Sequence, residues 1–413
     1  MTARQARISC RVCRAKLESP FLDLGMSPLA NSLLLPEYAN KVENFFPLAV
    51  YVCTKCWLVQ LPKTVSPARI FTHYAYFSSY STGWLDHAKA YVERMTRERS
   101  LSKESRVVEL ASNDGYLLQF FHERGVPVLG IEPAANVAAK AQERGIETRV
   151  TFFNARVAAA LVEEGLSADL LVANNVFAHV PDLNDFVSGI KTILKPGGLA
   201  TLEFPHLLKL LDEVQFDTIY HEHYSYFSLT AAERAFATAK LAVVDVEELP
   251  THGGSLRVHV MHAGARAPAP AVAALREAER EAGLTRASTY AAFGDRVAGI
   301  KRDLLALLID LKRQGKRIAG YGAAAKGTTL LNYCGIRSDF LDFVADKSPH
   351  KQGLLMPGVH VPVVAPDVIR SVKPDAVLIL PWNLTREITA ELADVKSWGG
   401  RFVVPIPTPQ VLA

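Results

Sequence analysis

An alternation of short apolar runs with longer helix-like runs constrains the fold of this chain most. Four such runs, RVVEL, VLGIEP, DLLVANN and LATLEFP, lie between residues 106 and 205, and helical patterns separate them. Strands that alternate with helices in this way pack as a parallel sheet with helices on both faces. The sequence therefore predicts an α/β protein whose central part is a doubly wound, Rossmann-like sheet.

The ends of the first two runs indicate which ligand this sheet binds. Asn113 and Gly115 belong to a tight turn that opens a helix, where backbone N–H groups can approach a ligand. Glu132 ends the second run, where an acidic side chain can accept hydrogen bonds from both hydroxyls of a ribose. With the later segments ANNVFAHVPDL and LKPGGL, these features resemble class I S-adenosylmethionine-dependent methyltransferases. Ala111 and Asn113 replace two glycines of the usual turn, and a sheet without a cofactor is the alternative.

Eight residues at these strand ends are the predicted contacts of S-adenosylmethionine. They are Glu109, Ser112, Asn113, Gly115, Glu132, Pro133, Asn174 and Asn175.

Four of the five cysteines form two C-x-x-C pairs, Cys10 with Cys13 and Cys53 with Cys56. This spacing lets both thiolates of a turn reach one metal, so we predict a structural zinc site with four sulfur ligands and no open position. Residues 1–66 have few periodic apolar runs and would depend on the metal for a core. Four unrelated thiols, or a redox pair, are the alternatives.

A second glycine-rich turn, GYGAAAKG, follows an apolar run in the last third of the chain. Gly320, Gly322 and Ala325 give the pattern G-x-G-x-x-A at the start of a helix, where backbone N–H groups can bind a diphosphate. Lys326 could add a positive charge, and Asp346 ends the next apolar run, where it could bind a ribose. By itself the turn predicts a nicotinamide cofactor, but another nucleotide or no ligand is an equal alternative.

The segment Phe216–Leu229, FDTIYHEHYSYFSL, is too polar for an ordinary core. Two histidines and a glutamate alternate there with three tyrosines. Histidine has a pKa near neutrality, so this segment is typical of a site that moves protons. His221, Glu222 and His223 could instead bind a metal, or the segment could be a solvated loop.

Taken in order, the motifs resemble the sugar C-methyltransferases that act on nucleotide-linked 4-keto-deoxysugars. The resemblance covers nearly the whole chain, from the C-x-x-C pairs through SSYS, ELASNDG, NNVFAHVPDLNDF, YHEHYSYFS, PTHGGSLRV and GYGAAAKG to PWN at 381–383. It implies a zinc-binding module at 1–66, a methyltransferase domain with a tyrosine-rich connector at 67–250, and a Rossmann-like nucleotide-sugar domain at 251–413. It also assigns the turn at Gly320 to the substrate diphosphate.

The resemblance further implies the chemistry and its residues. A ketone acidifies the hydrogens on the neighbouring carbons, a base removes one of them, and the enolate carbon accepts the methyl group. The implied catalytic residues are His223 as the base, with Glu222, Tyr220, His179, Tyr74 and Tyr76. A turn cap is the alternative role for His179, and simple packing is the alternative for either Tyr74 or Tyr76. The predicted substrate contacts are His221, Tyr224, His252, Gly253, Arg257, Tyr321, Gly322, Ala323, Lys326, Asp346 and Asn383.

Composition argues against several other classes of protein. The net charge of +4 over 413 residues is small and unclustered, which argues against a zinc-ribbon nucleic-acid methyltransferase. No apolar stretch approaches the roughly 18 residues of a membrane span, so we expect a cytosolic enzyme, either a monomer or a weak homodimer. A nucleotide-dependent oxidoreductase or epimerase is a further alternative, which depends on the Gly320 turn alone. Methylation at carbon 3 or carbon 5, with thymidine or guanosine as the base, stays open at this stage.

Overall fold

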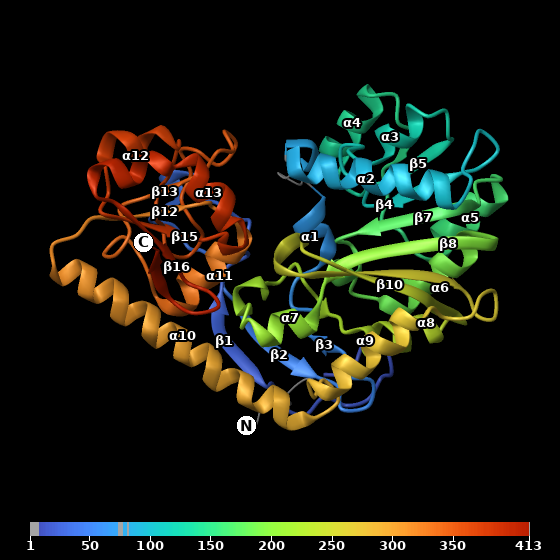
Figure 1. Ribbon diagram of the computed structural model, residues 1–413, viewed down its shortest axis with the longest axis horizontal. Coiled ribbons are helices and arrows are strands. Elements are labelled where there is room, and N and C mark those ends of the chain that lie inside the picture. Colours follow the sequence, from blue (N-terminus) through green and yellow to red (C-terminus); the bar gives the residue numbers. More distant parts are fainter. Residues whose placement is uncertain (1–7, 73–76, 81, 413) are drawn as a thin grey trace. The chain divides into compact units, whose positions relative to one another are not determined.

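The computed structural model describes residues 8–72, 77–80 and 82–412. Its contacts divide the chain into two compact units that are interleaved along the sequence (Figure 1). Unit 1 consists of the described residues up to Glu18, with 53–206 and 224–285, and unit 2 consists of 19–52, 207–223 and 286–412. The units therefore cut across the three consecutive domains that the sequence suggests.

Unit 1 is built on a seven-stranded sheet in the order β10-β11-β8-β7-β4-β5-β6. The strands are β4 (Val107–Leu110), β5 (Val128–Ile131), β6 (Thr148–Arg149), β7 (Ala168–Asn174), β8 (Leu194–Pro205), β10 (Leu241–Leu249) and β11 (Ser255–His262). The first five in sequence are parallel, whereas β11 is antiparallel to both β8 and β10. β4 and β5 are buried throughout, as expected for central strands that read as continuous apolar runs. The doubly wound parallel sheet predicted from the sequence is confirmed.

Helices lie on both faces of this sheet (Figure 1). They are α2 (Thr82–Glu98), α3 (Leu118–His122), α4 (Ala135–Glu143), α5 (Ala155–Glu163), α6 (Leu183–Ile193), α8 (Leu229–Ala237) and α9 (Pro270–Glu281). Side chains of Asn154, Asp182 and Ser228 cap α5, α6 and α8 by accepting backbone N–H groups. Phe177 stacks on Phe227 at 4.2 Å within the core of unit 1. Unit 1 also contains α1 (Pro67–Phe71) and the pair β3 (Val59–Gln60) and β9 (Ser225–Tyr226).

Unit 2 has its own six-stranded sheet, in the order β14-β13-β12-β15-β16-β17. The strands are β12 (Ile318–Tyr321), β13 (Val344–Ala345), β14 (Val363–Val364), β15 (Ala376–Ile379), β16 (Arg401–Val404) and β17 (Gln410–Leu412), and β17 alone of these is antiparallel to its neighbour. Its helices are α7 (Leu207–Asp212), α10 (Ala287–Arg313), α11 (Ala325–Cys334), α12 (Asp367–Val372) and α13 (Thr385–Glu391). The C-terminal part of the chain thus forms a second Rossmann-like sheet with its own helices.

Two early strands belong to unit 2 because of their packing partners. β1 (Leu22–Ser27) pairs antiparallel with β2 (Phe46–Val52) and packs against α10 and α11. The ring of Phe21 meets the edge of Tyr290, on α10, at 5.3 Å. Within the described part of the chain, every helix is too short or too polar to cross a membrane.

Candidate active site

The four predicted zinc ligands converge in unit 1. The sulfur atoms of Cys10, Cys13, Cys53 and Cys56 lie within 4.8 Å of one another, and two of the Sγ–Sγ distances are 3.4 Å. Four sulfurs about 2.3 Å from one ion at tetrahedral angles would be about 3.8 Å apart. Both C-x-x-C turns close in the same way, with a backbone N–H donated to the carbonyl of the first cysteine. The donor set and its dimensions therefore fit a closed structural zinc site.

Arg11, inside the first cysteine turn, connects this site to the rest of unit 1. Its guanidinium donates to the carbonyls of Leu61 and Pro181, and it lies 5.2 Å from the ring centroid of Tyr224. The hydroxyl of Tyr224 donates to the carbonyl of Val65 at 2.8 Å. The structure therefore places Tyr224, predicted as a substrate contact, in the packing beside the zinc turns.

The turn after β4 has the geometry of a glycine-rich loop although it contains only one glycine. Ala111, Asn113 and Gly115 have φ angles of 51°, 50° and 77°. This left-handed conformation costs a residue with a side chain about 1–2 kcal/mol. Gly115 also has little space, because an added Cβ would lie 3.2 Å from Cγ1 of Ile146. Ala111 and Asn113 therefore adopt the left-handed conformation that glycine favours.

Glu132 connects the ends of β4 and β5. One carboxylate oxygen accepts the N–H of Asn113 at 3.0 Å, and the other accepts the N–H of Ala134 at 2.8 Å. The side chain is 5% exposed, and burial raises its pKa to about 7, although the two N–H groups act in the opposite direction. Each oxygen keeps a second lone pair, which a ribose hydroxyl could use.

Four buried polar atoms around this turn have no hydrogen-bond partner among the described residues. They are Oε2 of Glu109, Oγ of Ser112, Oδ1 of Asp114 and Oδ1 of Asn174. Burial raises the pKa of Glu109 well above its usual value. Glu109 lies near the end of β4, Ser112 and Asp114 follow that strand, and Asn174 ends β7, so all four are at the carboxyl edge where ligands bind to α/β sheets. Unpartnered buried polar atoms are uncommon, so this group fits a ligand rich in hydrogen-bonding groups, such as S-adenosylmethionine.

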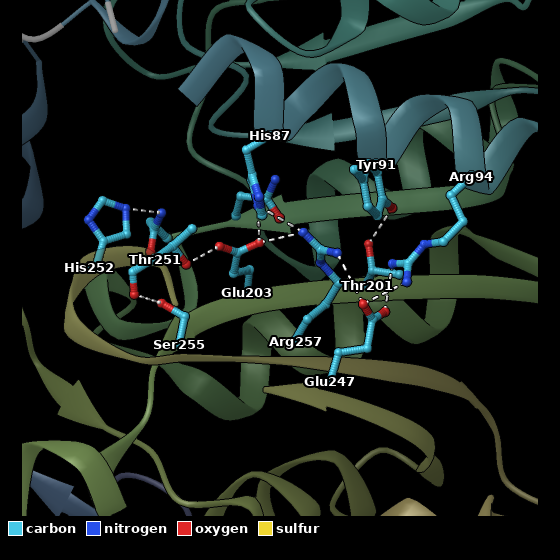
Figure 2. A network of polar contacts seen from close by, with 12 residues as sticks. His87, Tyr91, Arg94, Thr201, Glu203, Glu247, Thr251, His252, Ser255 and Arg257 are labelled. Atoms are coloured by element: carbon cyan, nitrogen blue, oxygen red, sulfur yellow. Dashed lines mark hydrogen bonds and ion pairs between the residues drawn. The ribbon is translucent and has the colours of Figure 1, made fainter. Parts of the chain in front are cut away.

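Arg257 lies inside a polar network that spans β8, β10, β11 and α2 (Figure 2). Its guanidinium donates to Glu203 at 2.6 Å and to Glu247 at 3.4 Å, and it lies 4.6 Å from the ring centroid of Tyr91. Burial would raise the pKa of Glu203, but the hydrogen bond from His87 and the charge of Arg257 outweigh burial and lower the pKa to about 2. The charge of Arg257 is thus neutralised within unit 1, and its role as a substrate contact stays a prediction.

Two residues of unusual backbone conformation lie beside Glu203. Asn175 and His252 have φ angles of 54° and 56°, and their side-chain nitrogens are 3.2 Å apart. The carbonyl of Glu203 accepts the N–H of Asn175 at 2.7 Å, and its carboxylate accepts the hydroxyl of Thr251 at 2.9 Å. The ring of Trp84 lies 5.3 Å from that of His252. Strained residues of this kind cluster at ligand sites. Asn175 therefore stays a predicted cofactor contact, and His252 and the adjacent Gly253 stay predicted substrate contacts.

His223, the predicted base, lies in unit 2 and is 8% exposed. Its Nδ1 is 2.9 Å from the carbonyl oxygen of Thr218. A carbonyl can only accept a hydrogen bond, so Nδ1 carries a hydrogen, and in the neutral form of the ring Nε2 carries the lone pair. The ring of Tyr220 lies 4.2 Å from that of His223. The tautomer is therefore the one in which Nε2 can act as a base.

The two residues before His223 are held by other parts of unit 2. Glu222 accepts a hydrogen bond from the side-chain amide of Asn31 at 2.7 Å, and burial raises its pKa to about 7. His221 donates from Nε2 to the carbonyl of Pro47 at 3.1 Å, and burial lowers its pKa. Among the described residues, the four cysteines are the only group of three or more side chains placed to bind a metal, which disfavours a metal at His221 and His223.

The second glycine-rich turn lies at the carboxyl ends of β12, β13 and β15. Gly322 has a φ of 87°, and an added Cβ would lie 2.5 Å from Cδ of Pro381, so only glycine fits there. Asp346 accepts the N–H of Ala323 at 2.7 Å. The hydroxyl of Tyr321 donates to Glu391 at 3.2 Å. The predicted residues of the nucleotide turn are thus brought together, several of them by hydrogen bonds to one another.

Comparison with known proteins shows the family. Three family models match in succession: a zinc binding domain at residues 10–71, a methyltransferase domain at 84–246, and a C-methyltransferase C-terminal domain at 250–407. The chain is 37% identical over 405 residues to the C-methyltransferase NovU of Streptomyces niveus, covering 98% of this chain and 96% of that protein. This chain belongs to the C-methyltransferase family. Its methyl donor is S-adenosylmethionine, and its structural metal is zinc.

Two more distant relatives of this C-methyltransferase each match less than half of it. A ubiquinone biosynthesis O-methyltransferase of Chelativorans sp. is 27% identical over 115 residues, which cover 28% of this chain and 46% of that protein. The solved structure of a magnesium protoporphyrin IX methyltransferase from Synechocystis, with bound S-adenosylmethionine, matches 44% of this chain and 80% of its own at 12% identity. Its TM-score of 0.35 is too low to support any inference.

One further predicted catalytic residue of this C-methyltransferase, His179, belongs to unit 1. His179 ends the short helix η3 (Phe177–His179) in unit 1, where its ring meets the edge of Phe71 at 5.3 Å. Tyr74 and Tyr76 lie outside the described residues. Sequence reasoning did not predict Asp114, whose Oδ1 has no partner among the described residues, as a site residue. It also missed Asp217, although Asp217 stands four residues before His221. Nothing in a single sequence marks one aspartate as buried.

Proposed function

We propose that this enzyme methylates a carbon atom beside the ketone of a nucleotide-linked 4-keto-deoxysugar, such as one attached to thymidine diphosphate. One observation carries the proposal: the Nδ1–H of His223 is donated to the carbonyl of Thr218, which leaves Nε2 with the lone pair. A carbon acceptor must lose a proton before it can attack, whereas many oxygen and nitrogen acceptors already have a lone pair. A buried histidine in the correct tautomer meets that need.

The contents of unit 2 support the kind of substrate. His223 and the turn at Gly322 belong to the same compact unit. A helix N-terminus that follows a glycine-rich turn favours a diphosphate. A base and a nucleotide site on one unit suit a substrate whose acidic carbon is attached to a nucleotide.

The proposed reaction has two steps. Nε2 of His223 removes a hydrogen from the carbon beside the ketone, and the electron pair moves to the ketone oxygen to form an enolate. Tyr220 and Glu222 would orient the base and the sugar. S-adenosylmethionine supplies an electrophilic methyl group when bound. The enolate carbon would take that methyl group while the electron pair of the sulfur–methyl bond stays on sulfur, which leaves as S-adenosylhomocysteine. The proton stays on Nε2 of His223 until solvent takes it.

Hydrogen exchange tests this proposal without methyl transfer. In heavy water without S-adenosylmethionine, the wild-type enzyme should introduce deuterium beside the ketone of a thymidine diphosphate 4-keto-6-deoxysugar. His223→Asn should bind both ligands yet exchange at least about 100-fold more slowly, since a positioned base contributes about 100- to 10,000-fold. The labelled carbon, read by NMR, would distinguish carbon 3 from carbon 5.

His360→Asn is a matched control, because His360 is in the same unit and pairs with Glu43 at 2.9 Å. That variant should exchange at the wild-type rate. Exchange by His223→Asn at the wild-type rate would show that the base is another residue. Methylation of a nucleotide keto sugar without any exchange would also contradict the proposed mechanism.

A further inference from the structure

Asp217 is a buried carboxylate to which the proposed reaction gives no role. It lies in the short helix η4 (Phe216–Thr218) and is 0% exposed. Its Oδ2 accepts the indole N–H of Trp382 at 2.8 Å, whereas its Oδ1 has no hydrogen-bond partner among the described residues. Burial raises its pKa to about 6, and the charge of Lys326 acts in the opposite direction. A carboxylate in such a place requires a cation nearby if it is to remain ionised.

Lys326 is a cation that faces the same tryptophan. It lies in the first turn of α11, where its Nζ donates to Oδ1 of Asn383 at 2.6 Å and is 4.6 Å from the ring centroid of Trp382. Burial lowers its pKa, and the charge of Asp217 raises it. These contacts give Lys326 partners within the protein, whereas the glycine-rich turn alone suggested a diphosphate as its partner.

Asp217 begins the segment that ends at His223, and this segment is attached to α11. The hydroxyl of Thr329, on α11, donates to the carbonyl of Ile219 at 3.0 Å. The carbonyl of Thr218, next to Asp217, accepts the Nδ1–H of His223 at 2.9 Å. A displacement of Asp217 would therefore move the group that orients the ring of His223.

We propose that the buried carboxylate of Asp217 and the partly buried ammonium group of Lys326, which both contact Trp382, form a charge pair that positions His223 relative to the nucleotide-binding turn. Asp217 is then a positioning residue, and Lys326 is its counter-ion. The inference rests on the proposed function, because it takes His223 as the base. The charge pair would affect the rate through the position of His223, because a displacement of about 1 Å in a reacting group can slow a reaction about 100-fold.

Two charge-removing variants and their combination test the pair. Asp217→Asn keeps an acceptor for Trp382 and removes the negative charge, whereas Lys326→Met keeps the length of the side chain and removes the positive charge. Each single variant leaves one charge of the pair uncompensated, so we expect deuterium exchange to slow about 10- to 100-fold, with at most about a threefold change in the dissociation constant of thymidine diphosphate. The double variant should recover to within about fivefold of the wild type, because neither charge remains.

An exposed pair in the same unit provides the control. Lys316 and Asp375 are 2.9 Å apart, and both side chains are more than one-third exposed. Lys316→Met and Asp375→Asn should leave exchange and nucleotide binding unchanged. If Lys326→Met weakens thymidine diphosphate binding tenfold or more while Asp217→Asn exchanges normally, Lys326 binds the diphosphate and the proposal is overturned. Losses that multiply in the double variant would overturn it too.

A measurement without substrate separates this proposal from the proposed function. If the wild type exchanges no hydrogen of any nucleotide keto sugar, the proposed function fails, and the pair is judged by the ring-nitrogen NMR shifts of His223, identified from their absence in His223→Asn. Those shifts should change in each single variant and return in the double variant; unchanged shifts in the single variants refute the proposal. If the single variants do not fold, a folded double variant supports the pair, and an unfolded one refutes it.

Discussion

Gly322→Ala should destabilise the folded nucleotide turn, and the structure allows the loss of stability to be worked out. The residue has a φ of 87°, and the new Cβ would lie 2.5 and 2.6 Å from Cδ and Cγ of Pro381. A left-handed alanine costs about 1–2 kcal/mol, and crowding in a packed site adds about 1–3 kcal/mol. We therefore expect the free energy of unfolding to fall by about 2–5 kcal/mol.

Two further variants separate the backbone cost from the steric cost. Gly353 has a similar φ of 82° but nothing within 4 Å of an added Cβ. Gly353→Ala should therefore cost only the backbone part, about 1–2 kcal/mol. Pro381→Ala removes the two carbon atoms that the new methyl group would meet. Combined with Gly322→Ala, it should lose less stability than the sum of the two single changes.

Hydrogen exchange followed by mass spectrometry is the suitable assay. Peptides that cover β12 and α11 report the opening free energy of this turn without assuming that both units unfold together. The decisive comparison is between Gly322→Ala and Gly353→Ala, each measured in its own peptides. Equal losses of protection, or strictly additive losses in the double variant with Pro381→Ala, would refute the steric part of the reasoning.

Two more perturbations test the metal and the cofactor site. The wild type should contain one zinc ion per chain by metal analysis, and Cys53→Ser should lose both the zinc and solubility because thiolate ligation is coupled to folding. Cys334 is a buried cysteine of unit 2, and Cys334→Ser should keep the metal. Zinc-free active protein would contradict this prediction. Because burial raises the pKa of Glu132 to about 7, the folded protein without ligand keeps a proton that the unfolded chain releases above about pH 4.3, so stability should fall as the pH rises from about 4 to 7. Glu132→Gln should remove this contribution, which is worth about 4 kcal/mol at pH 8. Urea titrations that give both proteins the same change in unfolding free energy between pH 4.5 and pH 8 would rule it out.

Local patterns in the sequence determined the class of fold and the kind of chemistry. Apolar runs at strand spacing predicted the parallel sheet, because a strand buried on both faces must be apolar along its whole length. The C-x-x-C spacing predicted the metal, because the ligands of one turn are neighbours in the chain. Glu132, at the end of its strand, lies next to the turn that contains Asn113. The order of the motifs was sufficient to predict the C-methyltransferase family.

Tertiary structure alone decided which distant residues share a compact unit. Residues 19–52 join unit 2 because β1 packs against α10 and α11, more than 250 residues later in the chain. The tertiary structure likewise decided which charged side chains become neighbours. The sequence predicted Arg257 and Lys326 as substrate contacts, and the fold pairs Arg257 with Glu203 at 2.6 Å and brings Lys326 and Asp217 to the same tryptophan, Trp382. A buried charge pairs with whatever opposite charge the fold brings near it, and local periodicity carries no information about that partner.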